Sequence, residues 1–317
     1  MTYQPATISD DPNTLPQLPS WVTAARPETP EDVAFLSGAA LTVLDQLVSD
    51  PRHGVPVKLL GNRLALSAAT ATSKVEGRLA READIRDAFH LTPPGEARGP
   101  DGDLLAFWRK AVRLRAGGTG EVADLVGADF ADELGVWLDA GLERSRTHGP
   151  LAGCVSVLRA VLEVDDRAER VACRLSDIVL ARVLNWKTVL PVSAQRLTKA
   201  MLRDLNSDEQ EAELAVQVRI LESIEETLRL ARELARRAEA LRSVAPKLRA
   251  KGSEAAVDLF LSEDSVAPAS MLAPCIRGTS IPMTSRAARR FCDRLVELGV
   301  ARELTGRPTF RLYGIAP

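Results

Sequence analysis

Residues that commonly bind metals or form disulfides are scarce in this chain of 317 residues. The sequence contains four cysteines and three histidines. None of them is spaced as CxxC or HxxxH, the patterns that zinc sites use. The sequence therefore predicts no metal site, and we expect no bound cofactor.

Aromatic residues and long apolar runs are scarce as well. Aromatic residues make up 4% of the chain, whereas alanine, leucine and arginine abound, a composition typical of a mostly helical protein. No uninterrupted apolar stretch approaches the roughly 20 residues that a membrane-spanning helix needs. The first residues also lack the basic segment and apolar run of a signal peptide. We therefore expect a cytoplasmic protein with no membrane partner.

The chain also lacks an excess of charge of either sign. Lysine and arginine number 41, aspartate and glutamate number 43, and the net charge is −2. A chain this close to neutrality has no overall attraction for nucleic acid. Any basic surface must therefore be local.

Changes in composition divide the chain into four parts. Residues 1–28 contain five prolines among polar residues and predict a flexible, extended tail. Residues 29–206 predict a helical body, which begins with a capping threonine followed by a proline. Residues 207–250 carry apolar residues at three- and four-residue steps and predict one long connecting helix. Its apolar face predicts packing within a bundle, and an intermolecular coiled coil stays open as an alternative. Residues 251–317 form a fourth, distinct pattern.

Two glycine-rich segments interrupt the helical patterns of the body. Residues 92–102 (TPPGEARGPDG) predict a loop. Residues 117–120 (GGTG) are not followed by the Lys-Ser/Thr pair of a phosphate-binding loop, so they predict a linker. Around these breaks we expect helices over residues 33–47, 57–76, 82–91, 103–115, 128–146, 151–162, 167–184 and 193–205.

The last part of the chain predicts a winged helix-turn-helix. Three short helical patterns are followed by two strand-like runs, at residues 300–304 and 309–313. Thr284 or Ser285 can cap the start of the third helix, and Gly299 can end it. The apolar residues of this helix recur on one face, at Ala287, Phe291, Leu295 and Leu298.

The opposite face of the third helix is basic. Between Arg277 and Tyr313 the chain holds eight arginines and three acidic residues, the charge sign that a phosphate backbone attracts. In the usual geometry the third helix enters the major groove and the turn between the strands contacts the backbone or the minor groove. A basic face can also be merely solvated, and winged helices also dock proteins. The residues that we expect to bind DNA are Ser285, Arg286, Arg289, Arg290 and Arg307.

A segment of the body resembles a known family. Residues 72–77 (TSKVEG) resemble the Ser/Thr-x-x-x-Glu-Gly signature of the inhibitory helix in Fic-domain proteins. The long helix that leads into a winged helix is similar to the C-terminal half of many of these proteins. The resemblance implies a degenerate Fic-like bundle in which Glu76 pairs with Arg159.

Fic proteins transfer AMP from ATP with a His-Pro-Phe-x-Asp/Glu-Gly-Asn-Gly-Arg-x-x-Arg loop. Residues 148–159 (HGPLAGCVSVLR) are similar to this loop at His148, Gly153 and Arg159. Ala152 stands at the position of the metal-binding carboxylate, and the phosphate-binding arginine is absent as well. Because this transfer needs a base, a metal ligand and an anion cradle together, the resemblance implies a protein without the catalytic loop.

Over nearly its whole length the chain also resembles a bacterial family known as domain of unknown function 1403. The resemblance rests on residues 63–66 (RLAL), 88–92 (AFHLT), 177–182 (DIVLAR) and 304–314 (LTGRPTFRLYG). It implies no established activity.

We therefore predict a mostly α-helical protein, with a helical bundle and a C-terminal winged helix-turn-helix. Its expected function is that of a non-enzymatic, DNA-associated regulatory protein. One alternative is a pseudoenzyme or adaptor whose winged helix docks a protein partner. Another is a divergent Fic-type nucleotidyl transferase that uses His148. A homodimer stays open, because one winged helix covers only a short stretch of DNA.

Overall fold

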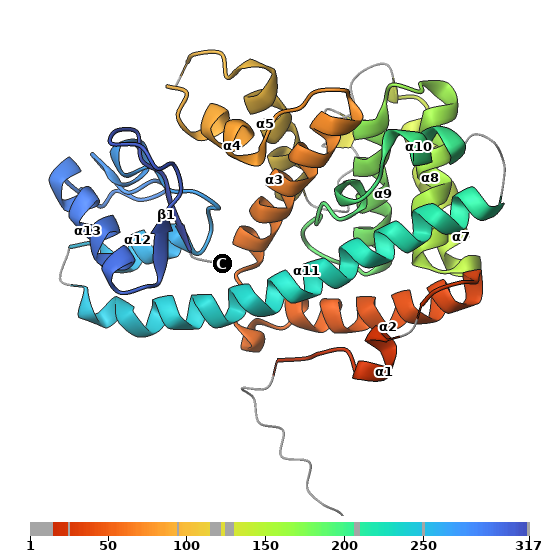
Figure 1. Cartoon of the computed structure of the whole chain (residues 1–317), viewed down its shortest axis with the longest axis horizontal. Coiled ribbons are helices and arrows are strands. Elements are labelled where there is room, and N and C mark those ends of the chain that lie inside the picture. Colours follow the sequence, from red (N-terminus) through yellow and green to blue (C-terminus); the bar gives the residue numbers. More distant parts are fainter. Residues whose placement is uncertain are drawn as a thin grey trace, which may run out of the picture.

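The computed structural model describes residues 15–24, 26–93, 95–114, 122–123, 130–205, 210–248 and 251–315. Within these ranges the protein is mostly helical, as predicted, and a two-stranded antiparallel sheet lies near the C-terminus. Figure 1 shows a body of packed helices, a long helix along one side of it, and a smaller C-terminal module (residues 251–315) at one end. The predicted GGTG linker and most of the predicted tail lie outside the described residues.

The helices of the body follow the predicted pattern with few exceptions. Most of them pack through one apolar face, and this face forms a continuous buried core. The body contains α1 (Ser20–Thr23), α2 (Pro30–Ser49), η1 (Pro51–His53), α3 (Val57–Val75), α4 (Glu82–His90), α5 (Gly99–Arg113), α7 (Leu134–His148), α8 (Pro150–Val164), α9 (Glu169–Val183), η3 (Ser193–Gln195) and α10 (Lys199–Asp204).

Local signals in the sequence set the ends of several helices. The Thr29 hydroxyl accepts a hydrogen bond from the Asp32 amide, and the Asp32 carboxylate accepts one from the Thr29 amide, both at 3.1 Å. This reciprocal pair caps the start of α2. Gly77, with φ +76°, follows the end of α3 in a left-handed conformation that glycine adopts without strain.

The start of α5 differs from the prediction. We expected a loop over residues 92–102, but α5 begins at Gly99 and contains Gly102. A Cβ atom at Gly102 would lie 3.1 Å from the carbonyl oxygen of Ala88 in α4. The glycine therefore permits a close approach between two helices, and its presence does not mark a loop.

The helix expected over residues 193–205 is broken into η3 and α10. The Asp177 carboxylate accepts hydrogen bonds from the backbone amides of Val192 (3.0 Å) and Ser193 (2.8 Å). Burial raises the pKa of Asp177 to about 7, although these hydrogen bonds act in the opposite direction. Asp177 of α9 thus holds the start of η3, and the Thr198 hydroxyl, which accepts a hydrogen bond from the Met201 amide (3.3 Å), starts α10 as a separate helix.

The long connecting helix is present as α11 (Gln210–Val244), followed by the short η5 (Ala245–Lys247), which contains the helix-ending Pro246. It packs lengthwise against α2 (Figure 1). By length and composition α2 is the one described helix that could cross a membrane, although such a helix can equally be a core helix. Its buried residues, including Val33, Leu36 and Leu44, belong to the core.

The C-terminal module combines short helices with a small antiparallel pairing. In β1 and β2, Ala301 lies opposite Ile315 and Glu303 opposite Tyr313. On its other side Tyr313 exchanges two backbone hydrogen bonds with Val266, at 2.7 and 2.9 Å. The elements are α12 (Ser253–Phe260), the single π-helical turn η6 (Pro268–Leu272), α13 (Ser285–Glu297), β1 (Ala301–Glu303) and β2 (Tyr313–Ile315).

The second strand was predicted at residues 309–313, and that prediction is wrong. Residues 309–312 are irregular, and β2 begins at Tyr313. Pro308 has no amide hydrogen for a strand ladder, and Phe310 has a left-handed backbone with φ +55°. Strand pairing with β1 therefore begins after these two residues, and β2 starts at Tyr313.

A buried polar cluster joins the body to the C-terminal module. Arg109 of α5 donates hydrogen bonds to the carboxylates of Asp264 and Glu263, and the side chains of Arg109 and Asp264 are 3% and 1% exposed. His90 Nε2 lies 3.4 Å from the Asp264 carboxylate. Burial alone would raise the pKa of Asp264, but the charges of His90, Arg109 and Arg63 hold it well below its usual range. Asp264 is therefore ionised and paired inside the protein.

Three further side chains of the body donate hydrogen bonds to backbone carbonyls of the module. They come from two helices, α3 and α4, and reach both ends of the module's sequence. Because each bond has a fixed geometry, together they set the orientation of the module on the body. The bonds join Asn62 to Ser262 (2.7 Å), Arg63 to Ile315 (2.8 Å) and Arg86 to Leu304 (3.1 Å).

We predict that Asp264→Asn destabilises the protein. The substitution leaves Arg109 buried against a neutral amide, and the loss of one partner of a buried ion pair costs about 3–5 kcal/mol. The free energy of unfolding in urea should fall by about this amount. Because the pKa of Asp264 is lower in the folded state, its stabilisation is complete above the unfolded carboxyl pKa of about 4 and is lost as the pH falls below it.

Glu254→Gln is the matched control, since Glu254 is an exposed carboxylate of α12 in the same module. The Glu254→Gln variant should have about the same unfolding free energy at neutral pH as the unmodified protein. Its unfolding free energy should also decline below pH ~4 as that of the unmodified protein does. Equal unfolding free energies for the two variants would show that the charge of Asp264 does not hold the module.

Candidate nucleic-acid interface

The ends of α13 are set by the residues predicted to cap it. The Thr284 hydroxyl accepts a hydrogen bond from the Ala287 amide (3.2 Å), and Gly299 follows the helix with φ +72°. Phe291 and Leu295 are buried as predicted, whereas Ala287 and Leu298 are only half-buried. The buried face is completed by Ala288 and by Cys292, which is a free thiol.

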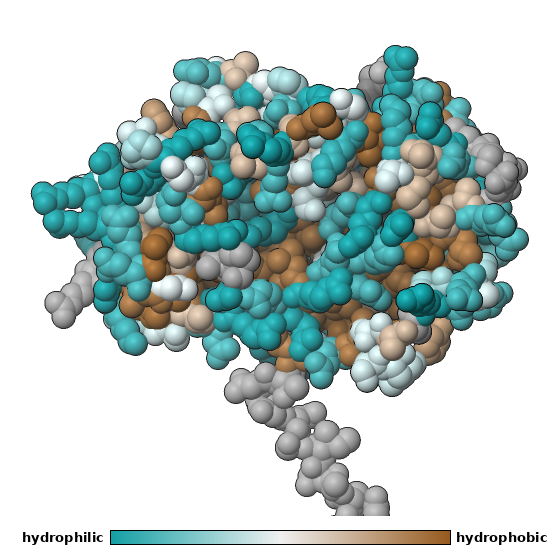
Figure 2. Space-filling model, viewed as in Figure 1, coloured by the Kyte–Doolittle hydropathy of each residue, from teal (hydrophilic) through white to brown (hydrophobic). Residues whose placement is uncertain are grey.

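The opposite face of α13 presents exposed arginines near its start. Arg286, Arg289 and Arg290 are exposed, as is Ser285 at the first helical position. Within the described ranges, none of these three guanidinium groups forms an ion pair or a hydrogen bond. Figure 2 shows hydrophilic residues along the edge of the molecule where α13 lies. The first half of α13 therefore carries three guanidinium groups that pair with no acidic side chain of the described residues.

Several other exposed arginines form an ion pair with a carboxylate three or four positions away, whereas Arg113, Arg203 and Arg229 form none within the described residues. Later on α13, Arg294 pairs with Glu297 at 2.9 Å. Further examples are Arg81 with Asp84, Arg219 with Glu222, and Arg237 with Glu233.

Charge changes sign along α13. The arginines without partners lie in its first six residues, whereas Asp293 and Glu297 lie in its second half. The first turn of a helix also presents backbone amides and the positive end of the helix dipole. The start of α13 is therefore the part of this surface best suited to an anion.

Arg307 lies in the turn between β1 and β2, as predicted, but it has an acidic partner. Its guanidinium is 3.2 Å from the carboxylate of Asp87 in α4, and its side chain is 56% exposed. The Glu303 carboxylate accepts hydrogen bonds from the amides of Thr305 (2.7 Å) and Gly306 (2.8 Å). The hairpin turn is thus held both internally and against the body. Sequence reasoning missed Asp87, because no local pattern links α4 to this turn.

The structure does not bring Glu76 and Arg159 together. Glu76, at the end of α3, lies 2.5 Å from Arg170 of α9 and 3.2 Å from Arg78. Arg159 of α8 lies 3.6 Å from Glu213 and donates to the Leu205 carbonyl (3.1 Å). The pairing implied by the Fic resemblance is therefore corrected: the end of α3 faces α9, and Arg159 faces the start of α11.

The segment similar to the Fic loop is packed as a helix contact. His148 ends α7 and lies on the surface, with its ring nitrogens 2.7 Å from the Thr147 hydroxyl and 3.1 Å from an Arg144 guanidinium nitrogen. Gly153 of α8 lies so close to α7 that a Cβ there would collide with the Ser145 hydroxyl. The neighbouring Ala152 and Cys154 are 4% and 0% exposed. The start of α8 therefore packs directly against α7, and no space for a phosphate group is left between the two helices at Gly153.

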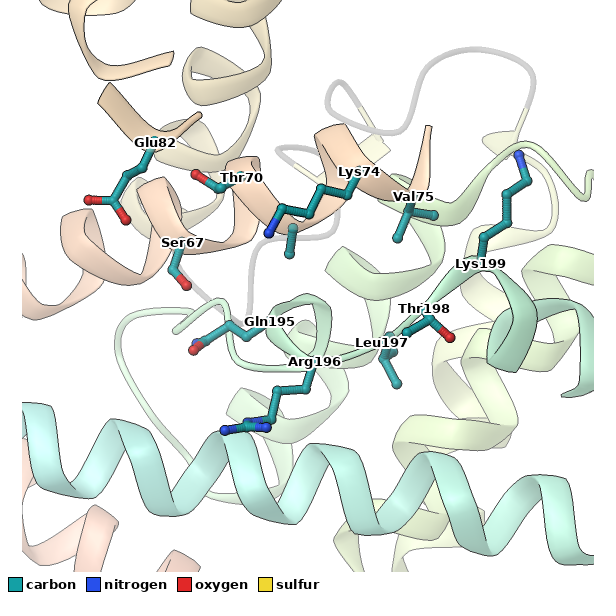
Figure 3. A pocket seen from close by; sticks show the side chains of 11 residues that line it. Ser67, Thr70, Lys74, Val75, Glu82, Gln195, Arg196, Leu197, Thr198 and Lys199 are labelled. Atoms are coloured by element: carbon teal, nitrogen blue, oxygen red, sulfur yellow. The ribbon is translucent and has the colours of Figure 1, made fainter. Parts of the chain in front are cut away.

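A cavity of about 350 Å³ lies between α3 and the segment of residues 195–199. Figure 3 shows Lys74 pointing into it, whereas Arg196 points toward α11. Arg196 pairs with Glu226 and with Glu222, at 3.4 Å to the latter. Neither His148 nor Glu76 lines this cavity, so it does not collect the residues of the Fic resemblance.

Comparison with known proteins identifies one family. A family model described as "Protein of unknown function (DUF1403)" matches residues 6–315. No curated protein matches the chain.

Glu303→Ala should loosen the hairpin turn. The substitution removes the acceptor of the Thr305 and Gly306 amides, and hydrogen bonds to a charged group contribute about 1.5–3 kcal/mol. We expect the amide hydrogens of these two residues to exchange with solvent about tenfold faster or more, measured by NMR. Glu303→Gln keeps an acceptor oxygen and should change the rates less. Unchanged exchange in the alanine variant would contradict this role for Glu303.

Proposed function

The chain belongs to the DUF1403 family of proteins of unknown function, and we propose from its own surfaces that it is a non-enzymatic regulatory protein that binds duplex DNA. The C-terminal module is the proposed binding part. We interpret this module as a winged helix-turn-helix, with α12, η6 and α13 as its three helical segments. The antiparallel pair β1–β2 and the turn between its strands would form the wing.

The observation that carries this proposal is the set of three arginines at the start of α13 that have no acidic partner in the described part of the chain. Their side chains face solvent on a helix whose other arginine, Arg294, is paired. Three nearby guanidinium groups attract a polyanion, and DNA binding releases the counterions condensed on its phosphates. The near-neutral net charge of the whole chain makes this local concentration the main electrostatic feature for such a ligand.

The proposed complex assigns a distinct contact to each part of the module. The first-turn amides of α13 and the Ser285 hydroxyl would donate hydrogen bonds to a phosphate. Arg286 and Arg290, on the exposed face, would reach base edges or phosphates in the major groove. Arg289 lies on the flank beside the hairpin and would contact a phosphate of the duplex, and Arg307 would reach the backbone after partial release from Asp87.

Protein docking is the second candidate function, and one observation favours it. Phe310 in the hairpin turn is 75% exposed, although a phenylalanine ring gains free energy when it is removed from water. An adaptor would bury this ring against a partner protein. We do not propose nucleotidyl transfer, because the segment similar to the Fic loop is packed against α7.

We predict salt-dependent binding of the full chain to a labelled random duplex, measured by fluorescence anisotropy. Affinity should fall steeply with salt, and log K against log salt should have a slope of about −0.9 for each phosphate contact. Arg289→Ala and Arg290→Ala should each weaken binding and reduce the slope by about one unit.

Arg219→Ala is the control variant, because Arg219 is an exposed arginine of α11 that pairs with Glu222. It should bind the duplex as the unmodified protein does. An affinity for the duplex that neither α13 variant changes would move the contact away from this helix. Absence of binding at every salt concentration would favour the protein-docking function.

A further inference from the structure

A cleft of about 720 Å³ lies between the end of α4 and the C-terminal module. Its walls come from three parts of the module, namely η6, α13 and the hairpin turn, and from residues 90–93 of the body. This volume is in the range of sites for small organic molecules, which often lie where two parts of a fold meet. It is twice as large as the cavity beside Lys74, and it is lined differently.

Most of the cleft wall is apolar. Leu91 and Pro93 line it from the body, and Pro268 and Pro308 line it from the module. Phe310 also lines it, from a left-handed backbone conformation that a bulky residue rarely adopts. A flat apolar molecule in the cleft would cover a ring that is otherwise 75% exposed.

The charged side chains that line the cleft are two arginines, Arg289 and Arg311, and one aspartate, Asp293. Arg289 has no acidic partner within the described residues, and Arg311 is held at the cleft by a hydrogen bond from its Nε to the Arg307 carbonyl (3.0 Å). The acidic side chain in the wall, Asp293, accepts a hydrogen bond from the Tyr313 hydroxyl (3.2 Å). One guanidinium group is therefore available to an anion next to an apolar surface.

We propose that this cleft binds a small amphipathic anion, with a flat apolar ring system and one carboxylate, sulfonate or phosphate group. The ring system packs against Phe310 and the prolines, and the anionic group contacts Arg289. Charge complementarity selects the anion, and the mixed walls exclude a ligand that is polar throughout.

The same geometry makes the ligand a competitor of DNA. This step rests on the proposed function, in which Arg289 contacts a phosphate of the duplex. Because one guanidinium group cannot pair fully with two anions in different places, occupation of the cleft weakens DNA binding. By linkage, DNA weakens ligand binding by the same factor.

The test uses 8-anilinonaphthalene-1-sulfonate as the probe, since it joins an aromatic ring system to one sulfonate. Its fluorescence is titrated with the full chain and with Arg289→Met, Phe310→Asn and the control Arg302→Met. Asparagine tolerates the left-handed backbone at position 310 and removes the ring. Arg302 is an exposed residue of β1 outside the cleft, so its variant makes the same change of charge.

We expect each of the two cleft variants to weaken probe binding about tenfold. Arg289→Met removes the charged hydrogen bond to the sulfonate, and Phe310→Asn removes the ring that packs against the probe. Arg302→Met should bind the probe as the unmodified protein does. Failure of the protein to bind the probe, or equal affinities in all four proteins, would overturn the site.

A second arm measures duplex binding by anisotropy with and without a saturating concentration of the probe. Weaker duplex binding in its presence supports competition at Arg289, and unchanged binding overturns it. A chain that binds no duplex at all overturns the proposed function and the competition together, whereas the fluorescence arm still decides whether the cleft binds the anion.

Discussion

The buried ion pair between Arg109 and Asp264 is the constraint on which the arrangement of the C-terminal module depends. Two charges that are almost completely removed from water are stable only while both are present and well hydrogen-bonded. His90 and Glu263 complete the cluster, and the body can meet the module in one orientation only. That orientation places the end of α4 beside the hairpin turn, and His90 of this cluster also lines the cleft.

Arginine has two distinct roles in this protein. Arg109, which is buried, and Arg63, which is half-buried, join the body to the module, where a planar group with several donors can satisfy carbonyls and carboxylates together. The arginines at the start of α13 join nothing within the described chain. The first group therefore explains stability, and the second group is the basis of the proposed contact with an anionic partner.

Much of the helical body could be predicted from the sequence, because the apolar period and the caps are local signals. Thr29, Gly77 and Gly299 end or begin helices as expected. The features that could not be predicted depend on contacts between distant segments. Gly102 lies inside a helix at the close approach of α4, and Asp177 of α9 holds the start of η3 through the amides of Val192 and Ser193. At the candidate interface the exposed arginines were predicted, whereas the partner of Arg307 and the cleft arise only from the docking of the module on α4.

The length of α11 sets the distance and the rotation between the body and the C-terminal module. At about 1.5 Å and 100° per residue, its 35 residues carry the chain about 52 Å from the far end of the body toward the module. One inserted or deleted residue would turn the chain that leaves this helix by about 100°. The carboxylate of Asp264 would then no longer face Arg109. We therefore expect α11 to tolerate substitution of its exposed side chains much better than the insertion or deletion of a residue.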